Sequence, residues 1–516
     1  MVKFVNHNLL SKLRRLDIYE QLNILFCIVW FFSLLLLSRF HEIGGYGVET
    51  DFYGAFAPGA KAMMEGKMDV DPRYGPGYHL VLILFYSIIN NMFEVGKLVS
   101  ILSAVLVCFF TFKIVKNLFD SRVAFFSILP LSLIILPWSV LASSDLFFAL
   151  LVTLCLYFLF KGDSINLKNL FFSGLVAGYA YITRSSGIFI FVSMALILLF
   201  INPDSKPWSN RLKFLAAFVS AGLIIIVPWL LTNYFLGNDL NRANRYVLIA
   251  SHFYGRPGVI RSEDIMAASK KFNSLSNVVF YDFKYFVLHY VGNIYRHFHG
   301  LMLNFIKFPA CLFVVSGFMV FFRKMDKRQL SFIIFPVVAH LLLCLVHFEP
   351  RYYLFIISFF LVFAVYFFFG SWNSEISNKW FRYLNLGTFI VLIFFLGLSS
   401  TRQLKHYLTT EPLELLSVSQ HLIREAETDD IIIARKPHLG YFSNLKTAYF
   451  PEVNSVVELI NSAKEIKAKY IFYGEIELER RPQFRELLDL NNKYPDLQLV
   501  HYSDNPKMVL YKIIGS

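Results

Sequence analysis

The chain has 516 residues, of which 56% are hydrophobic, 18% are aromatic and only 16% are charged. In soluble globular proteins close to a quarter of the residues are charged, so this composition excludes an ordinary soluble protein. Many apolar runs approach the roughly 20 residues that cross a bilayer as a helix, which predicts a polytopic α-helical membrane protein. The net charge of +13 would suit nucleic acid, but most Lys and Arg residues lie between apolar runs, so we expect the anionic membrane face, and no nucleic acid, as their partner.

No signature of a common soluble enzyme class occurs in the sequence. It has no Walker loop, no GxGxxG after a strand, no HExxH and no serine elbow. The five cysteines lie inside apolar stretches without metal-binding or disulfide spacing, so we expect them to pack in the core. No cofactor is predicted, and a divalent metal is left open.

The first apolar span covers about residues 22–38, and basic residues precede it. No small-residue cleavage site follows, which predicts a retained anchor with a cytoplasmic N-terminus and an external first loop at 39–97. In that loop, Asp51 lies about a dozen residues beyond the span and shortly after Glu49. Holding a carboxylate at a membrane surface costs free energy, so a carboxylate found there commonly has a function. Both acids are therefore candidate catalytic residues. The alternative interpretation is that they are solvated acids of a loop.

Residues 78–93 form an apolar piece that is short for a span and contains two asparagines. If this piece does not cross, the Lys- and Arg-rich short connectors of the remaining chain all lie in the cytoplasm, as the positive-inside rule requires. We therefore predict a juxtamembrane helix at 78–93 and about eleven spanning helices in all. The predicted spans are 22–38, 98–118, 122–141, 146–160, 169–183, 187–202, 212–235, 301–322, 330–347, 352–370 and 381–398.

The longest connector, residues 236–300, lies outside in this topology. Its part from Asp282 to Phe298 alternates aromatic and basic residues, as an interfacial amphipathic helix would. Long loops in compact proteins tend to be functional. A solvated basic face is one interpretation, and a lid over an anionic substrate or the acceptor is the other, with Arg245, His252 and Arg256 as the candidate residues.

The chain changes character near residue 400, so we predict a membrane domain at 1–400 and a soluble domain at 401–516. Strands that alternate with helices indicate a small α/β domain, and an odd number of spans places it on the extracytoplasmic side. An apolar stripe at helical spacing, from Leu415 to Ala426, opens this domain. The predicted strands are 431–434, 470–473, 497–502 and 508–513, with helical stretches near 454–468 and 482–490.

Charged residues at the external ends of the predicted spans are the strongest chemical signal. Asp145 opens the fourth span, Arg184 follows the fifth, and Glu349 and Arg351 precede the tenth, where Tyr352 suits the membrane interface. Such charges are costly unless they are paired or solvated. Asp145 has a second interpretation as a helix-capping acid, and the arginines have one as side chains that snorkel to the interface. Two guanidinium groups beside an apolar wall also suit the phosphate of a lipid.

Five motifs, taken in their order along the chain, resemble the GT-C membrane glycosyltransferases, and within them the bacterial protein mannosyltransferase and aminoarabinose transferase group. They are ETDFYG after the first span, RYGPGYHL, SSDLFF, ITRSSG and HFEPRYYLFIISFF. The resemblance covers most of the predicted membrane domain, and the soluble tail is similar to the small α/β domain of some bacterial members. It implies a GT-C-like fold, a polyprenyl-phosphate sugar donor, and inverting transfer to a lipid, glycan or protein acceptor on the extracytoplasmic face of the inner (plasma) membrane.

The resemblance also implies roles for individual residues. Asp51 matches the first-loop acid that acts as the base, and Thr50 separates it from Glu49 where many relatives have adjacent acids. Asp145 matches the second-loop acid of the family. The candidate donor-phosphate residues are Arg184 and Arg351, which match the arginines of the family, together with Arg73 and His79 of the first loop.

Two other classes of protein also fit a basic polytopic chain. A transporter or flippase of lipid-linked sugars commonly has repeated halves and interrupted helices, and the sequence indicates neither. An enzyme like the O-antigen ligases or polymerases would use a lipid diphosphate donor and place its key Arg and His in the long loop, which His252 and Arg256 keep open. A non-catalytic scaffold is disfavoured because the acids gather on one side of the membrane. The expected function is therefore that of a membrane glycosyltransferase.

Overall fold

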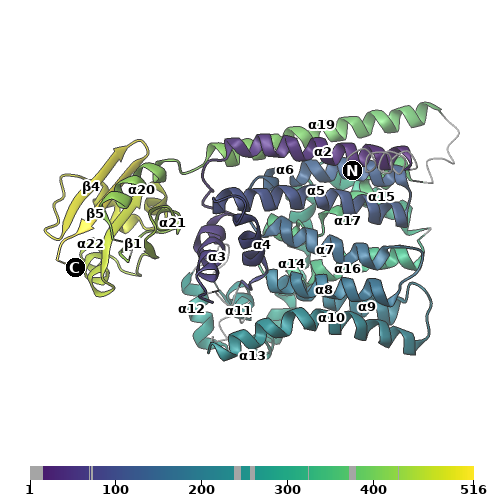
Figure 1. Cartoon of the computed structure of the whole chain (residues 1–516), viewed down its shortest axis with the longest axis horizontal. Coiled ribbons are helices and arrows are strands. Elements are labelled where there is room, and N and C mark those ends of the chain that lie inside the picture. The colour runs from purple at the N-terminus through teal and green to yellow at the C-terminus, as the bar shows by residue number, and fades with distance from the viewer. Residues whose placement is uncertain are drawn as a thin grey trace, which may run out of the picture. The chain divides into compact units, whose positions relative to one another are not determined.

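The computed structural model describes residues 16–68, 70, 74–237, 246–255, 262–323, 325–370, 379–427 and 429–515. The chain divides into two compact units, which are described separately below (Figure 1). The membrane unit consists of Met1–Ser38 and Val70–Lys405, and the C-terminal unit consists of Arg39–Asp69 and His406–Ser516. The segment that carries Asp51 thus folds with the C-terminal residues, although in sequence it follows the first predicted span.

The membrane unit is a bundle of apolar helices, many of which run side by side in Figure 1. Within the described residues, five helical stretches are long and apolar enough to cross a bilayer, and a bent pair, Phe283–Ile306 with Ala310–Phe322, would make a sixth. The chain is therefore a multi-pass membrane protein, but the count of about eleven spans is not confirmed. The five stretches are Ile18–Phe40, Met92–Leu118, Ser121–Ser139, Trp208–Phe235 and Lys379–Glu425.

Short polar side chains define where several of these helices begin. Asn91 accepts hydrogen bonds from the backbone N–H groups of Phe93 and Glu94, and Asp120 accepts one from Val123. The helices of the membrane unit are α2 (Ile18–Leu37), α4 (Gly77–Tyr86), α5 (Met92–Leu118), α6 (Ser121–Ser139), α7 (Asp145–Phe160), α8 (Leu167–Thr183), α9 (Ile188–Leu196), α10 (Trp208–Phe235), α11 (Tyr246–Tyr254), α12 (Ser262–Lys271), α13 (Leu275–Tyr281), α14 (Phe283–His299), α15 (Ala310–Phe322), α16 (Lys327–Leu343), α17 (Ile357–Phe369) and α19 (Lys379–Thr409).

The helices depart from the predicted intervals at several places, of which those around α4 and before α15 are described here. The apolar piece predicted at 78–93 is the ten-residue helix α4, too short to cross a bilayer that needs roughly 20 residues, and α5 begins at Met92 instead of residue 98 because Asn91 caps it there. The span predicted at 301–322 is not continuous, because the chain bends by 117° before α15. At this bend Lys307 has a positive φ of 72°, and Pro309, which has no backbone N–H, is the N-cap residue of α15.

The C-terminal unit is a five-stranded sheet with helices packed on it (Figure 1). The strand order is β2-β1-β3-β5-β4, where β1 pairs in parallel with β2 and β3, and β5 pairs antiparallel with β3 and β4. All four predicted strands are present, whereas β2, which is only three residues long, was not predicted. The elements are η2 (Phe52–Phe56), α3 (Ala57–Met64), α20 (Glu414–Glu425), β1 (Ile431–Ile433), α21 (His438–Ser443), β2 (Lys446–Ala448), α22 (Val456–Glu465), β3 (Ala468–Gly474), α23 (Glu475–Arg480), η8 (Pro482–Leu488), β4 (Leu497–Asp504) and β5 (Lys507–Ile513).

The predicted apolar stripe of α20 packs on one face of this sheet. Leu415, Val418 and Leu422 are buried there together with Ile432 of β1. Ile43 of the first loop belongs to the same core and is fully buried. Burying an isoleucine side chain is worth roughly 1.5–3 kcal/mol. The part of the first loop around Ile43 therefore contributes to the core of the C-terminal unit.

Candidate active site

A partly buried ion pair joins the ends of two neighbouring helices of the membrane unit. Asp145 is the first residue of α7, and Arg184 directly follows α8. Arg184 Nη1 donates hydrogen bonds to Asp145 Oδ1 at 2.5 Å and to the hydroxyl of Ser144 at 3.1 Å. Ser144, not Asp145, is the N-cap residue of α7, and its side chain makes no capping hydrogen bond. The Asp145 carboxylate is thus placed to orient a guanidinium group.

A second arginine reaches the same place from the turn Pro350–Tyr353 before α17. Arg351 Nε forms an ion pair with Glu349 Oε1 at 2.7 Å. The guanidinium carbons of Arg184 and Arg351 lie 5.9 Å and 5.5 Å from the ring centroid of Tyr352, within the range of cation–π attraction. Burial acts to raise the pKa of Glu349, but His347 and Arg351 outweigh it and lower that pKa, so the carboxylate is charged at neutral pH.

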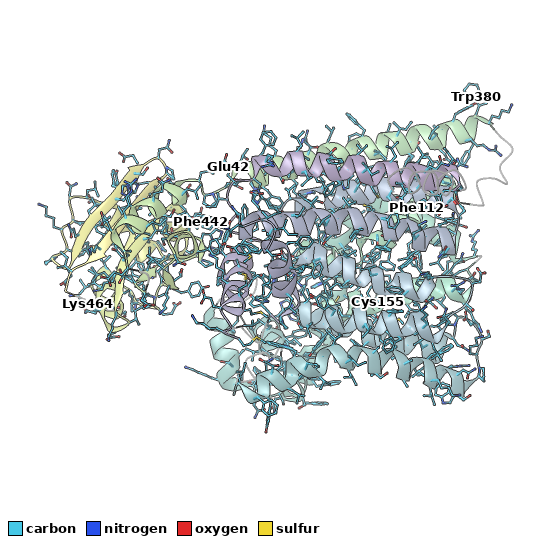
Figure 2. The ribbon with its side chains drawn as sticks, viewed as in Figure 1. Glu42, Phe112, Cys155, Trp380, Phe442 and Lys464 are labelled. Carbon is cyan, nitrogen blue, oxygen red and sulfur yellow. The ribbon has the colours of Figure 1, made fainter. Side chains whose placement is uncertain are left out.

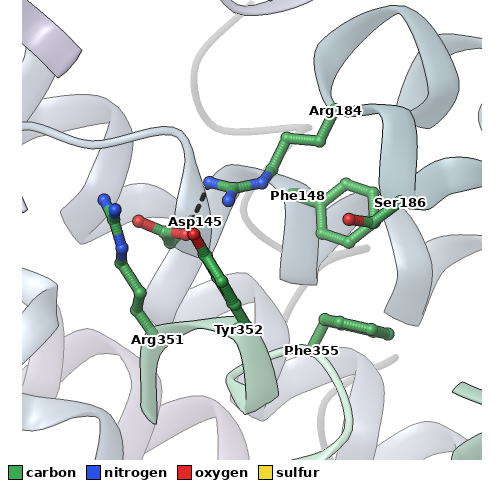
Figure 3. A pocket seen from close by; sticks show the side chains of 7 residues that line it. All are labelled: Asp145, Phe148, Arg184, Ser186, Arg351, Tyr352 and Phe355. Atoms are coloured by element: carbon green, nitrogen blue, oxygen red, sulfur yellow. Dashed lines mark hydrogen bonds and ion pairs between the residues drawn. The ribbon is translucent and has the colours of Figure 1, made fainter. Parts of the chain in front are cut away.

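These side chains surround a small pocket of about 230 Å³, counting the open space at its mouth (Figure 3). Asp145 is only 4% exposed, and its Oδ2 atom accepts no hydrogen bond from the residues that the structure describes. An anionic group bound in this pocket would contact two guanidinium groups and would compete with Asp145 for hydrogen bonds from Arg184. The pocket is lined by Asp145, Phe148, Arg184, Ser186, Arg351, Tyr352 and Phe355.

The glycine-proline-glycine turn before α4 packs against the residues that lead to Arg184. A Cβ atom on Gly75 would lie 2.2 Å from the carbonyl oxygen of Ile182, and one on Gly77 would lie 2.3 Å from the hydroxyl of Thr183. Only glycine permits so close an approach of two backbones. The Tyr179 hydroxyl of α8 also donates to the Gly77 carbonyl at 2.8 Å. The turn therefore fixes the end of α8 from which Arg184 extends.

His79, a predicted phosphate ligand, lies in the first turn of α4. Its ring is 1% exposed, and Nδ1 lies 3.0 Å from the carbonyl oxygen of Gly75. This contact places His79 among the residues that shape the turn, and it does not line the pocket.

The acids of the first loop lie in the C-terminal unit. Glu49 is 1% exposed, and its carboxylate contacts His41 Nε2 at 2.9 Å and accepts a hydrogen bond from the Gly45 N–H at 2.8 Å. Burial acts to lower the pKa of His41, but Glu49 and Glu411 outweigh it and raise that pKa to about 9. Asp51 is half-buried and directly precedes η2. Of the two acids, Glu49 thus serves a buried ion pair, whereas Asp51 lies closer to the surface.

The remaining candidates belong to the first and the long loop. His252 lies in α11, where Nε2 is 3.0 Å from the side-chain nitrogen of Asn293. Burial, followed by unfavourable electrostatic interactions with His289, His347 and Arg296, lowers the pKa of His252 to about 4, so its ring is neutral at neutral pH. The other three candidates, Arg73, Arg245 and Arg256, lie outside the described residues.

Several pocket residues were not singled out as site residues from the sequence. Tyr352 was predicted to anchor at the interface, and Phe148, Ser186 and Phe355 had no predicted role. Each lies within four residues of a predicted charge, which is the one signal that the sequence offers. Among the described residues, no cluster of three or more His, Cys, Asp or Glu side chains could hold a metal ion.

Comparison with solved structures shows the class of fold. ArnT from Cupriavidus metallidurans bound to undecaprenyl phosphate superposes with a TM-score of 0.60 at 13% identity, covering 96% of this chain and 98% of that protein. The archaeal oligosaccharyltransferase AglB from Archaeoglobus fulgidus, in complex with an inhibitory peptide and a dolichol-phosphate, superposes with a TM-score of 0.59 at 12% identity, covering 94% of this chain and 74% of AglB. The chain therefore shares its overall fold with ArnT and with AglB.

A family profile also matches part of the sequence. Residues 72–231 match the sequence profile of the family described as dolichyl-phosphate-mannose-protein mannosyltransferase, and this stretch includes Asp145 and Arg184. Among curated proteins, none matches the chain significantly in sequence. The chain is thus similar in sequence to this family over residues 72–231, and similar in fold to ArnT over nearly its whole length.

Proposed function

We propose that the chain transfers a sugar from a polyprenyl-phosphate donor to an acceptor on the extracytoplasmic face of the inner membrane, with inversion at the anomeric carbon. The observation that carries this proposal is the pocket in which Arg184 and Arg351 flank Tyr352. Its aromatic wall and two cations suit a phosphate attached to an apolar tail. Support also comes from the likeness in fold to ArnT, which was solved with undecaprenyl phosphate bound.

The proposed reaction is a single displacement. The acceptor oxygen attacks the anomeric carbon and forms the new glycosidic bond, while the bond from that carbon to the phosphate oxygen breaks. The phosphate leaves with the electron pair, and the guanidinium groups of Arg184 and Arg351 stabilise its charge. The proton of the acceptor passes to the carboxylate of Asp51, which acts as the general base.

Asp145 and Glu349 have supporting roles in this proposal. Each pairs with one of the two arginines and holds its guanidinium group in a defined direction. The pairing also compensates the cost of keeping the arginines partly buried before the donor binds. Because Glu49 is held by His41 and the Gly45 N–H, we leave it out of the proposed catalytic set.

Membranes that contain the protein test this function directly. A radiolabelled sugar on polyprenyl phosphate is supplied, and the lipid, glycan and protein fractions are then separated. We expect one fraction to gain label only when the protein is present, and free polyprenyl phosphate to inhibit the transfer. Label that crosses into vesicles without changing its lipid carrier would indicate a transporter, and use of a polyprenyl-diphosphate donor alone would indicate a ligase or polymerase.

The orientation in the membrane is part of the same proposal and has its own test. Asn461 is exposed on α22, so Asn461→Cys should react with an impermeant thiol reagent in intact cells. Ser209→Cys, at an exposed position near the start of α10, is the matched control and should react only after lysis. The five native cysteines are buried, so they contribute little background. The reverse labelling pattern would overturn the proposed orientation.

A further inference from the structure

The first loop is tied to the C-terminal residues by a buried charged cluster. Glu411 Oε1 contacts His41 Nδ1 at 2.5 Å, and Glu411 Oε2 accepts hydrogen bonds from the backbone N–H groups of Glu42 and Ile43. The other ring nitrogen of His41 contacts Glu49. Both ends of the stretch from His41 to Glu49 are therefore held through one imidazolium ring, which lies almost entirely out of solvent.

A second set of contacts comes from the turn between β1 and α21. Lys436 Nζ donates to the Thr50 hydroxyl at 3.1 Å, and Thr50 in turn donates to the Tyr46 carbonyl at 2.7 Å. His438 Nε2 lies 3.2 Å from the Gly45 carbonyl oxygen. Thr50 is the immediate neighbour of Asp51, so Lys436 holds the side chain of the residue directly before the proposed base.

Aromatic side chains fix the residues that follow Asp51. The ring of Tyr53 packs against His438, Tyr441 and Phe442 at centroid distances of 4.6, 4.9 and 5.2 Å, and its hydroxyl accepts a hydrogen bond from the Gly44 N–H. Phe52 and Tyr53 are buried, with 0% and 1% exposure. Asp51 is therefore held from both sides of its backbone while its own side chain is half-buried.

These contacts occupy a place where α/β domains usually bind ligands. Lys436 and His438 follow β1, whose neighbours β2 and β3 are parallel to it, and the crevice at the carboxyl ends of parallel strands is the common binding position. Here that position is filled by the chain's own first loop, through Gly45, Tyr46 and Thr50. A ligand-binding role for this edge of the sheet is thereby disfavoured.

We infer that the C-terminal α/β unit is a positioning module for the first loop, in which Lys436 and Glu411 hold the backbone around Asp51 so that its carboxylate is correctly placed for proton abstraction. This inference rests on the proposed function, in which Asp51 is the base. Lys436 and Glu411 are positioning residues, because they act through the loop and do not touch the substrate.

The test uses the full-length protein and steady-state kinetics with the polyprenyl-phosphate sugar. Lys436→Ala should lower kcat by roughly ten- to a hundredfold, since displacing a reacting group by about 1 Å has effects of this size, while KM for the donor changes little. Lys436→Arg keeps the charge and a donor to Thr50 and should recover most of kcat. Glu411→Gln, which keeps the shape of the side chain but removes the charge that pairs with His41, should lower kcat in the same way.

Lys464→Ala is the matched control in the same unit. Lys464 forms an ion pair with Asp496 at 2.6 Å, and Figure 2 shows it at a different end of the C-terminal unit from Phe442. We expect wild-type kcat for this variant. Unfolding of each variant is followed by its thermal transition, so that a loss of folded protein is separated from a loss of kcat.

A double variant distinguishes positioning from a general structural role. If Lys436 acts through Asp51, Lys436→Ala should cause no further loss in an Asp51→Asn background, because coupled residues are not additive. An additive loss, or a wild-type kcat for folded Lys436→Ala, would overturn the inference while leaving the proposed base in place. Full activity of Asp51→Asn alone would instead overturn the proposed base, so the two failures are distinguishable.

Discussion

Replacing Asp51 with asparagine is expected to lower the rate of sugar transfer by a factor of about 10² to 10⁴, the usual consequence of losing a general base. The substitution keeps the size and shape of the side chain and removes only its ability to accept the proton. The Thr50 hydroxyl before Asp51 accepts a hydrogen bond from Lys436, and Phe52 and Tyr53 after it are buried. The variant should therefore fold normally and bind the donor with nearly unchanged affinity.

Single-turnover transfer and donor binding, measured on the same preparation, check this expectation. Glu65→Gln provides the matched control, since Glu65 is an exposed acid of the same segment that pairs only at the surface with Lys67. Exposed ion pairs contribute little, so this control should retain wild-type turnover. Wild-type turnover in Asp51→Asn itself would exclude Asp51 as the base.

Loss of Arg351 is expected to weaken donor use by about ten- to a hundredfold. A charge-assisted contact to phosphate contributes roughly 1.5–3 kcal/mol, and each 1.4 kcal/mol is a factor of about ten in affinity. Arg351→Ala removes this contact together with the packing on Tyr352. Arg351→Lys should recover donor use only in part, because an ammonium group cannot form the planar two-pronged contact of a guanidinium.

Arg184→Ala should have a similar effect, with one complication that the structure explains. Asp145 is buried and would lose its cationic partner, which destabilises the fold independently of the donor. The double variant Arg184→Ala/Asp145→Asn removes the unpaired charge and isolates the effect on the donor. Arg323→Ala, at an exposed arginine that follows α15, is the control and should behave as wild type.

Inhibition by polyprenyl phosphate without a sugar gives the decisive measurement for both arginines. We expect it to compete with the donor in the wild type and to compete poorly in Arg351→Ala and in the Arg184→Ala/Asp145→Asn variant. Inhibition constants equal to those of the wild type in both variants would mean that the arginines only anchor their helices. The pocket would then have to be abandoned as the donor-phosphate site.

The sequence by itself determined the class of protein and most of the local structure. Apolar runs specify helices such as α5 and α10, because a helix in a bilayer satisfies its backbone hydrogen bonds without help from other segments. Alternation of strand and helix patterns likewise predicted β1, β3, β4 and β5. The charges at positions 145, 184 and 351 were also predicted to lie on one side, since topology alone brings the ends of spans to a common surface.

Only the tertiary structure decided which partners these residues have. Arg184 pairs with Asp145, and Tyr352 lies beside two guanidinium groups, because of the way α7, α8 and the turn before α17 pack. The periodicity of the sequence carries no information on such contacts. The bend before α15 and the three-residue strand β2 are also too local to leave a pattern. Most consequential is the packing of residues 39–69 with residues 406–516 in one unit, which depends on contacts such as that of His41 with Glu411, 370 positions apart in the chain.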